Sequence, residues 1–112
     1  IYFKDAARSI DMIYQASKEQ IKTVNYNVAG VVPTRSAGEI EQVVKKYIPG
    51  AQISYKPDTE AMNYFRTSTV DVFDDSRARE EWSWYAMYPN LDKVVVDFVE
   101  EIRSRPERYG IV

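Results

Sequence analysis

A capped amphipathic segment between two alternating segments is the feature that most restricts how this chain can fold. Residues 23–28 and 52–56 each alternate apolar and polar side chains, as half-buried strands do. Between them, Ser36 and Glu39 have the spacing of a capping box, which starts a helix, and residues 49–50, Pro-Gly, end it. A strand, a helix and a strand with short connections favour a parallel βαβ unit with a right-handed crossover. The apolar residues that alternate in the two strands are Val24, Tyr26, Val28, Ile53 and Tyr55.

Helices are also expected on both sides of this unit. Apolar residues at spacings of three and four predict a helix over residues 5–20, with Asp5 placed to accept free backbone N–H groups at its start. A short charged helix is expected over residues 76–82, and a last helix from Asn90. Residues 58–69 lack a clean period and predict a loop with about one helical turn. A further short extended piece is expected at Val70, Val72 and Phe73.

Composition excludes several classes of protein. The 112 residues suffice for one domain that buries roughly 65% of its unfolded surface. Histidine and cysteine are absent, and they are the usual zinc ligands, so no metal site is predicted. The formal net charge of -2 gives no electrostatic footprint for nucleic acid, and no apolar run reaches the roughly 20 residues that span a bilayer. We therefore expect a single α/β domain over residues 1–112 of a cytoplasmic protein.

Tyr14 and Lys18 match the Tyr-x-x-x-Lys pattern, in which a lysine lowers the pKa of a catalytic tyrosine. Residues four apart on a helix lie on the same face, so the geometry permits such a pair. Tyr14 continues the apolar face of its helix, however, and no glycine-rich phosphate loop precedes it. A structural role is therefore predicted for Tyr14, and no residue of the chain is predicted to be catalytic.

Acidic and aromatic residues border the short charged helix. Asp74 and Asp75 are conceivable metal ligands or an acid/base pair, but carboxylates at a helix start commonly act as caps, and capping by Asp75 or Ser76 is predicted. Trp82 and Trp84 are predicted to be buried against the last helix rather than to stack on a ligand. A solvated face with local ion pairs is predicted for Arg77, Arg79, Glu80 and Glu81.

Residues 63–69 are the best candidates for ligand contact. They join two ordered elements and combine two aromatic residues, one arginine and three hydroxyls. Arg66 can bind a phosphate or carboxylate through two parallel hydrogen bonds, with Tyr64 or Phe65 as an apolar wall. The alternative is an ordinary surface loop. The predicted substrate-binding residues are Tyr64, Phe65, Arg66 and Thr67.

The order of these motifs resembles the C-terminal part of the NAD-dependent epimerase/dehydratase family, the extended short-chain dehydrogenases. The matching segments are residues 2–8 (YFKDAAR), 26–30 (YNVAG), the helix over 36–47, and 74–84 (DDSRAREEWSW). The resemblance spans nearly the whole chain. It implies that the chain is the C-terminal, substrate-side lobe of a longer enzyme. The N-terminal Rossmann half, which is absent from this chain, would then bind NAD and carry the catalytic residues.

The resemblance implies a reaction for the longer protein. A tyrosinate would accept the hydroxyl proton of a small hydroxy amino acid while hydride moves to NAD. This lobe would cover the small-molecule substrate and exclude water. The resemblance also implies a homodimer. The chain alone is expected to bind no NAD and to be inactive, and we expect neither nucleic acid nor membrane as a partner.

Two alternatives stay open at this point. The longer protein could be a nucleotide-sugar epimerase or dehydratase in which Arg66 reaches the diphosphate. Residues 64–69 favour this alternative, because the family's amino acid dehydrogenases carry a Trp-Pro pair there and this chain does not. The chain could instead be an interaction module without chemistry. About 200 further residues with a glycine-rich loop upstream of Ile1 would exclude the interaction module.

Overall fold

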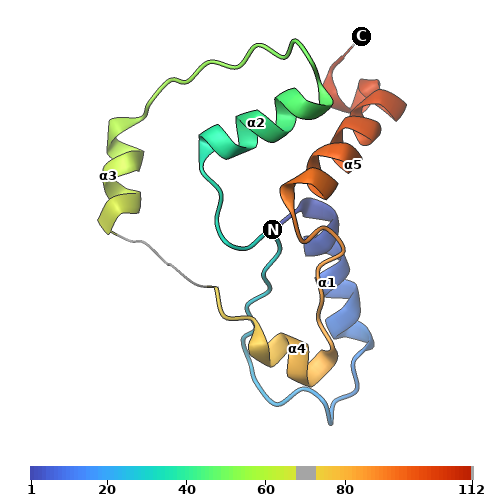
Figure 1. Ribbon diagram of the computed structural model, residues 1–112. Helices are drawn as coiled ribbons and strands as arrows, with labels where there is room; N and C mark the ends of the chain where they lie inside the picture. Colours follow the sequence, from blue (N-terminus) through green and yellow to red (C-terminus); the bar gives the residue numbers. More distant parts are fainter. Residues whose placement is uncertain (68–72, 112) are drawn as a thin grey trace.

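The computed structural model describes residues 1–67 and 73–111 (Figure 1). Within these ranges all regular secondary structure is helical, and none of the described residues forms a strand. No helix in the described ranges has the length and apolar character needed to cross a membrane. The elements in chain order are α1 (Phe3–Gln15), α2 (Ala37–Tyr47), α3 (Thr59–Thr67), α4 (Ser76–Trp82), α5 (Leu91–Ser104) and the 3-10 helix η1 (Pro106–Tyr109).

The predicted parallel βαβ unit is absent from the described residues. The helix between the two predicted strands forms, but residues 23–28 and 52–56 remain without a strand partner. A strand needs a neighbour about 4.8 Å away to satisfy its backbone groups, and alternation alone does not supply one. Val24, expected on the buried side, is 96% exposed. Of the third predicted extended piece, Val70 and Val72 lie outside the described residues, and Phe73 has no regular structure.

Capping residues start α2 and α5 as predicted. The Ser36 hydroxyl accepts a hydrogen bond from the Glu39 N–H at 3.3 Å, and the Glu39 carboxylate accepts one from the Ser36 N–H at 2.9 Å. Asn90 Oδ1 accepts from the Lys93 N–H at 3.0 Å. These bonds satisfy backbone donors that have no partner inside the helix. α1, by contrast, ends at Gln15, earlier than predicted.

α3 occupies the segment for which a loop was predicted, so that prediction was wrong. Its nine residues, Thr59–Thr67, begin beside Asp58, whose carboxylate accepts a hydrogen bond from the Ala61 N–H at 3.0 Å. Figure 1 shows α3 well apart from the other helices, after the long connection that follows α2. Tyr64 and Phe65 are 65% and 66% exposed. The helix is therefore formed locally, without a tertiary partner for its aromatic residues in the described chain.

The core lies between α1 and α4. Ala78, Trp82 and Trp84 form a buried cluster, in which the two indole side chains are 5% and 2% exposed. Ser83 ends α4 in the left-handed region with φ 59°, and Trp84 thereby lies beside Trp82, with ring centroids 5.9 Å apart. The predicted burial of the tryptophans is confirmed, but they pack against α1 rather than the last helix. The half-buried side chains around the cluster are Met12, Ile13, Ala16, Ile21, Tyr26, Val28 and Ala86.

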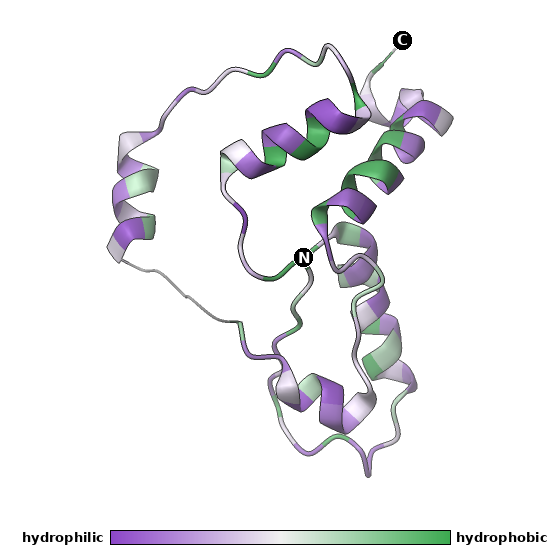
Figure 2. Cartoon of the chain, viewed as in Figure 1, coloured by the Kyte–Doolittle hydropathy of each residue, from purple (hydrophilic) through white to green (hydrophobic). Residues whose placement is uncertain are grey.

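The chain is more open than a compact domain of its size. Its Cα radius of gyration is 17.1 Å, against about 13 Å for a compact domain of this length. Its solvent-accessible surface is 8836 Å², against roughly 6,300 Å² for a folded monomer of this mass. Figure 2 shows hydrophobic positions on α2 and α5, which pack against each other, and on α3, which stands apart. A large part of the surface is therefore available for contact with another part of a protein or with a partner molecule.

Candidate functional site

All four residues predicted to bind substrate lie on α3. On an α-helix, successive side chains are about 100° apart. Tyr64 and Thr67 therefore share one face, whereas Arg66 projects about 200° from Tyr64. The Thr67 hydroxyl donates to the Tyr64 carbonyl at 2.9 Å, and the rings of Tyr64 and Phe65 meet edge to face with centroids 5.7 Å apart. The helix thus brings neighbouring pairs together but does not direct all four side chains to one ligand.

The Tyr-x-x-x-Lys pattern does not form a pair on one helix. Tyr14 lies near the end of α1 and is 87% exposed, so its predicted place on the apolar face is wrong. Lys18 lies beyond Gln15, the last residue of that helix. The i, i+4 geometry on which the pattern depends is therefore missing.

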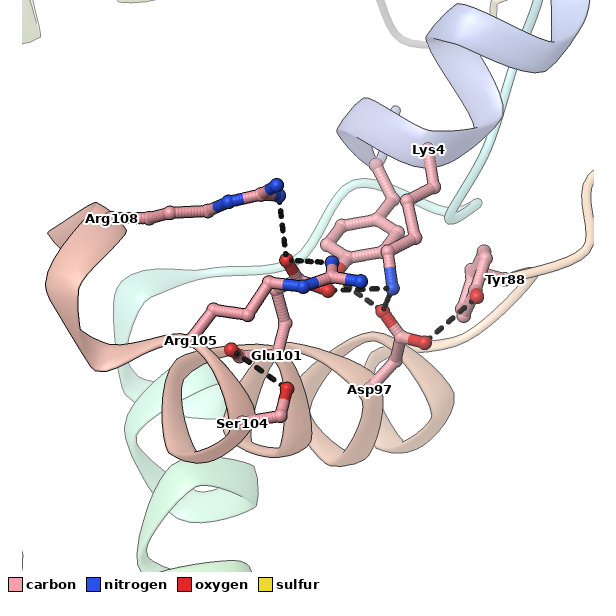
Figure 3. A network of polar contacts seen from close by, with 8 residues as sticks. Lys4, Tyr88, Asp97, Glu101, Ser104, Arg105 and Arg108 are labelled. Atoms are coloured by element: carbon pink, nitrogen blue, oxygen red, sulfur yellow. Dashed lines mark hydrogen bonds and ion pairs between the residues drawn. The ribbon is translucent and has the colours of Figure 1, made fainter.

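A network of polar contacts joins the start of α1 to α5 (Figure 3). Asp97 Oδ2 accepts a hydrogen bond from the Tyr2 hydroxyl at 2.7 Å and pairs with Lys4 Nζ at 2.7 Å. Its second oxygen accepts from the Tyr88 hydroxyl at 2.8 Å. One turn further along α5, Glu101 also pairs with Lys4, at 3.4 Å. Glu101 has further ion pairs with Arg105 and Arg108.

The electrostatics of this cluster are the opposite of those that activate a tyrosine. Burial raises the pKa of Tyr2, and its hydrogen bond to Asp97 raises it further. The pKa of Tyr88 is also raised, chiefly by its hydrogen bond to Asp97. Burial raises the pKa of Asp97 itself, but hydrogen bonds from Lys4 and the two phenols outweigh burial and lower it. A tyrosine that acts as a base needs a lowered pKa. The cluster therefore joins helices and does not activate a base.

Asp5 makes a second connection between distant segments. Its carboxylate is fully buried and accepts hydrogen bonds from the backbone N–H groups of Met87 and Tyr88 at 2.9 and 3.0 Å. These donors belong to the connection between α4 and α5. The predicted role of Asp5, capping its own helix, is replaced by this contact with a segment that follows it by more than 80 residues in sequence.

The acidic pair before α4 makes structural contacts, but the predicted capping by Asp75 or Ser76 is wrong, because no side-chain bond caps this helix from its N-cap residue. Asp74 Oδ1 accepts from the Ser76 N–H at 2.9 Å, which lowers the pKa of Asp74. Asp75 occupies the N-cap position without a side-chain capping bond; its carboxylate instead pairs with Arg79 at 2.7 Å and accepts from the Ala29 N–H at 3.4 Å. Among the residues with described positions, no three His, Cys, Asp or Glu side chains gather as a metal site would require.

The contacts of Glu81 differ from the prediction that it lies on a solvated helix face. Its carboxylate accepts hydrogen bonds from the hydroxyl of Tyr26, the N–H of Lys22 at 2.8 Å and the hydroxyl of Thr23 at 3.1 Å. The bond from Tyr26, followed by the one from Lys22, lowers the pKa of Glu81. The carboxylate thereby fixes residues 22–26 against α4. Sequence periodicity does not reveal this contact, because its partners are 55 to 59 residues away.

Three hollows in the described surface lie away from the predicted substrate-binding residues. One of about 440 Å³ is lined by residues of α2 and α5 together with Tyr88. A second, of about 340 Å³, lies between the first two residues, α2 and α5. A third, of about 280 Å³, lies beside α1 and includes Val24 and Trp82. None of these three includes a residue of α3, and no motif in the sequence predicted them.

The glycines of the chain do not build a phosphate-binding loop. A dinucleotide site of the Rossmann type needs several glycines in one turn at a helix start. Gly50 and Gly110 lie after α2 and η1 with φ of 92° and 67°, where the left-handed conformation favours glycine. At Gly30, an added Cβ would lie 2.9 Å from the Ile1 Cα, so this glycine permits close backbone packing. The glycines therefore do not supply a dinucleotide-binding loop of this type.

Comparisons with known proteins identify what the chain resembles, although no model of a known protein family matches it. The mitochondrial L-threonine 3-dehydrogenase of Bos taurus is 30% identical over 84 residues, which are 75% of this chain and 22% of that protein. The GalE-like L-threonine dehydrogenase of Cupriavidus necator is 29% identical, with a TM-score of 0.76 over 91% of this chain and 32% of the other. The L-threonine dehydrogenase of Phytophthora infestans is 25% identical, with a TM-score of 0.78 over 94% of this chain and 33% of the other.

The chain thus spans a third or less of the length of these three relatives. The agreement of sequence and structure comparisons confirms the resemblance predicted from the motifs. In sequence and in fold, the chain resembles one part of the L-threonine 3-dehydrogenases, enzymes of the epimerase/dehydratase family.

Proposed function

We propose that this chain is the substrate-side lobe of an NAD-dependent oxidoreductase similar to L-threonine 3-dehydrogenase. The observation that carries the proposal is the similarity of fold to two L-threonine dehydrogenases over more than nine-tenths of the chain. In the proposed reaction, hydride moves from the hydroxyl-bearing carbon of a small hydroxy amino acid to NAD, and a base accepts the hydroxyl proton. The N-terminal Rossmann half of the longer protein would hold NAD and supply that base.

The role of this lobe would be specificity and exclusion of water. α3 offers the predicted contacts, and its helical geometry divides them into two sets. Arg66 projects about 100° from Phe65 around the helix: the guanidinium would bind the carboxylate of the substrate through paired hydrogen bonds, and the phenyl ring, 66% exposed in this chain, would cover the edge of the site. Tyr64 and Thr67 would extend the contact along the adjacent face. The chain alone would be inactive, because bond-making groups lie elsewhere.

Threonine-dependent NADH formation by the full-length protein tests this proposal. We expect turnover with L-threonine and none with a nucleotide sugar. Turnover of a nucleotide sugar alone would replace the proposal with the epimerase/dehydratase alternative. A reading frame without a glycine-rich loop upstream of Ile1, together with no turnover of either compound, would favour an interaction module.

Arg66→Ala in the full-length protein tests the substrate contact. Loss of a guanidinium that binds the substrate carboxylate should raise KM for threonine at least about tenfold, the effect of one charge-assisted hydrogen bond. Arg77→Ala, at an exposed position of α4, is the matched control and should leave KM unchanged. Equal kinetics for both variants would remove Arg66 from the site.

Assembly and location complete the proposal. We propose a homodimer in the cytoplasm for the longer protein. The bovine relative is named as a mitochondrial protein, so cell fractionation should compare the two compartments. Sedimentation of the full-length protein would distinguish a dimer from a monomer.

A further inference from the structure

α3 is a short helix with little support from the rest of the described chain. None of its nine residues is buried, and Figure 1 shows it apart from the other helices. Isolated helices shorter than about 12–15 residues are only marginally stable in water, and most helices in proteins are stabilised by the packing of an apolar face. The fraction of molecules in which α3 is formed therefore depends on local interactions within residues 58–67.

The first of these local interactions is the N-cap at Asp58. Its carboxylate oxygen Oδ1 accepts a hydrogen bond from the Ala61 N–H at 3.0 Å, and its carbonyl accepts the first bond of the helix, from the Met62 N–H at 2.9 Å. Both bonds are those of an N-cap residue. A negative charge at this end of a helix is also favoured by the helix dipole. Asp58 is thus the residue that starts α3.

The residues predicted to contact substrate lie at the other end of the same helix. Arg66 is in the last turn, where the helix dipole favours a cation. The Thr67 hydroxyl donates to the carbonyls of Asn63 and Tyr64 at 3.2 and 2.9 Å. The direction of each of these side chains is fixed by helical geometry only while the helix is formed. Asp58 therefore acts at a distance on the side chains that would meet the substrate.

We propose that Asp58 is a positioning residue for substrate binding. Its cap keeps α3 formed before the substrate arrives and thereby holds Arg66 in the direction in which it meets the substrate carboxylate. This inference rests on the proposed function, because it requires α3 to contact the substrate. The apparent affinity for a ligand that binds only the helical form is reduced in proportion to the fraction of molecules in that form. Loss of the cap thus weakens binding and leaves the chemical step of the bound substrate unchanged.

Asp58→Ala in the full-length protein tests the cap through the kinetics of threonine oxidation. Loss of an N-cap changes the equilibrium of helix formation by about fivefold. We expect KM for threonine to rise about two- to fivefold, with kcat unchanged. Asp58→Asn should keep KM at the value of the unmodified protein, because asparagine caps as well as aspartate. An unchanged KM in Asp58→Ala, or the same rise in Asp58→Asn, would overturn the role of the cap.

Ser36→Ala is the matched control, because it removes the cap of a helix that is packed in the fold. α2 packs against α5 and carries none of the predicted substrate contacts. We expect Ser36→Ala to lower Tm by about 2 °C and to leave KM unchanged. Asp58→Ala should do the reverse, because α3 contributes no buried residue. An equal fall of Tm in both variants, or an equal rise of KM, would identify Asp58 as a structural cap alone.

Hydrogen exchange of the full-length protein separates this inference from the proposed function. The backbone amides of α3 should exchange faster in Asp58→Ala than in the unmodified protein or in Ser36→Ala. If these rates are the same in all three proteins, the cap does not hold α3 and the inference fails even where threonine is oxidised. If α3 exchanges faster in Asp58→Ala but the protein does not oxidise threonine, the proposed function fails and the holding of α3 by Asp58 stands.

Discussion

The hydroxyl of Tyr2 donates a 2.7 Å hydrogen bond to the carboxylate of Asp97, across 95 residues of sequence. Lys4 and Tyr88 approach the same carboxylate. Three donors thus surround one acceptor group, and that group joins the start of α1 to α5. The ionised form of Asp97 is therefore the form that stabilises this contact.

The stability of the protein should fall in acid as Asp97 becomes protonated. Its pKa is lowered in the folded state, because hydrogen bonds from Lys4 and the phenols outweigh the effect of burial. A group with a lowered folded pKa stabilises the protein above its unfolded pKa of about 3.9, and this contribution is lost as pH falls. We expect Tm to decrease between about pH 5 and pH 2, and Asp97→Asn to reduce that dependence. The control Asp11→Asn, at an exposed position, should leave the dependence of Tm on pH unchanged. The same dependence of Tm on pH in the unmodified protein and in both variants would contradict the role of Asp97.

Asp5→Ala should destabilise the protein by about 2–4 kcal/mol, because it leaves two partly buried backbone N–H groups without their acceptor. Those groups are the N–H donors of Met87 and Tyr88. Urea denaturation gives the free energy of unfolding. The control is Asp11→Ala on the exposed side of the same helix, where the carboxylate binds only Gln15 among the described residues. A similar effect of both substitutions would refute the connecting role of Asp5.

Glu81→Gln should loosen residues 22–26 without unfolding α4. The carboxylate accepts from Tyr26, Thr23 and the Lys22 N–H, and a neutral amide accepts such bonds less strongly. Hydrogen exchange should become faster at the backbone amides of Lys22 and Thr23. Glu80→Gln, on the exposed side of the same helix, provides the control and should leave these rates unchanged.

Ser36→Ala should cost about 1 kcal/mol, the usual effect of losing an N-cap. The hydroxyl of Ser36 accepts from the Glu39 N–H, and the reciprocal bond completes the capping box. Ser54→Ala, at an exposed position outside any helix, should have no such effect. Chemical denaturation of the two variants compares them; equal stability would mean that α2 does not depend on its cap.

Local chemistry in the sequence was sufficient to predict several helix boundaries. Ser36 and Asn90 cap because a hydroxyl or amide oxygen two to three residues before a free N–H reaches it without help from the rest of the fold. The short helix forms at residues 76–82 as predicted, although Asp75 at its N-cap position makes no side-chain capping bond. The resemblance to the epimerase/dehydratase family also rested on local motifs, and the comparisons confirmed it.

The strands and the candidate site depended on distant partners and were harder to predict. Residues 23–28 alternate correctly, but strand formation needs a neighbouring strand that the described chain does not supply. Asp5 and Glu81 resembled ordinary helix carboxylates, because their donors lie far away in sequence. At Tyr64 and Arg66, the absence of a clear period hid a helix, and helical geometry separates side chains that a loop would allow to converge.

Because both tryptophans lie in one part of the fold, tryptophan fluorescence does not report equally on all the helices. Trp82 and Trp84 lie in one cluster between α1 and α4, whereas α2, α3 and α5 contain only tyrosine and phenylalanine as aromatic residues. Within this chain, tryptophan fluorescence therefore reports on the α1–α4 end alone. Separation of α2 from α5 would leave that emission unchanged and would appear only in a probe of helix content such as circular dichroism. Unfolding curves from the two methods would coincide only if both ends of the chain unfold as one cooperative unit.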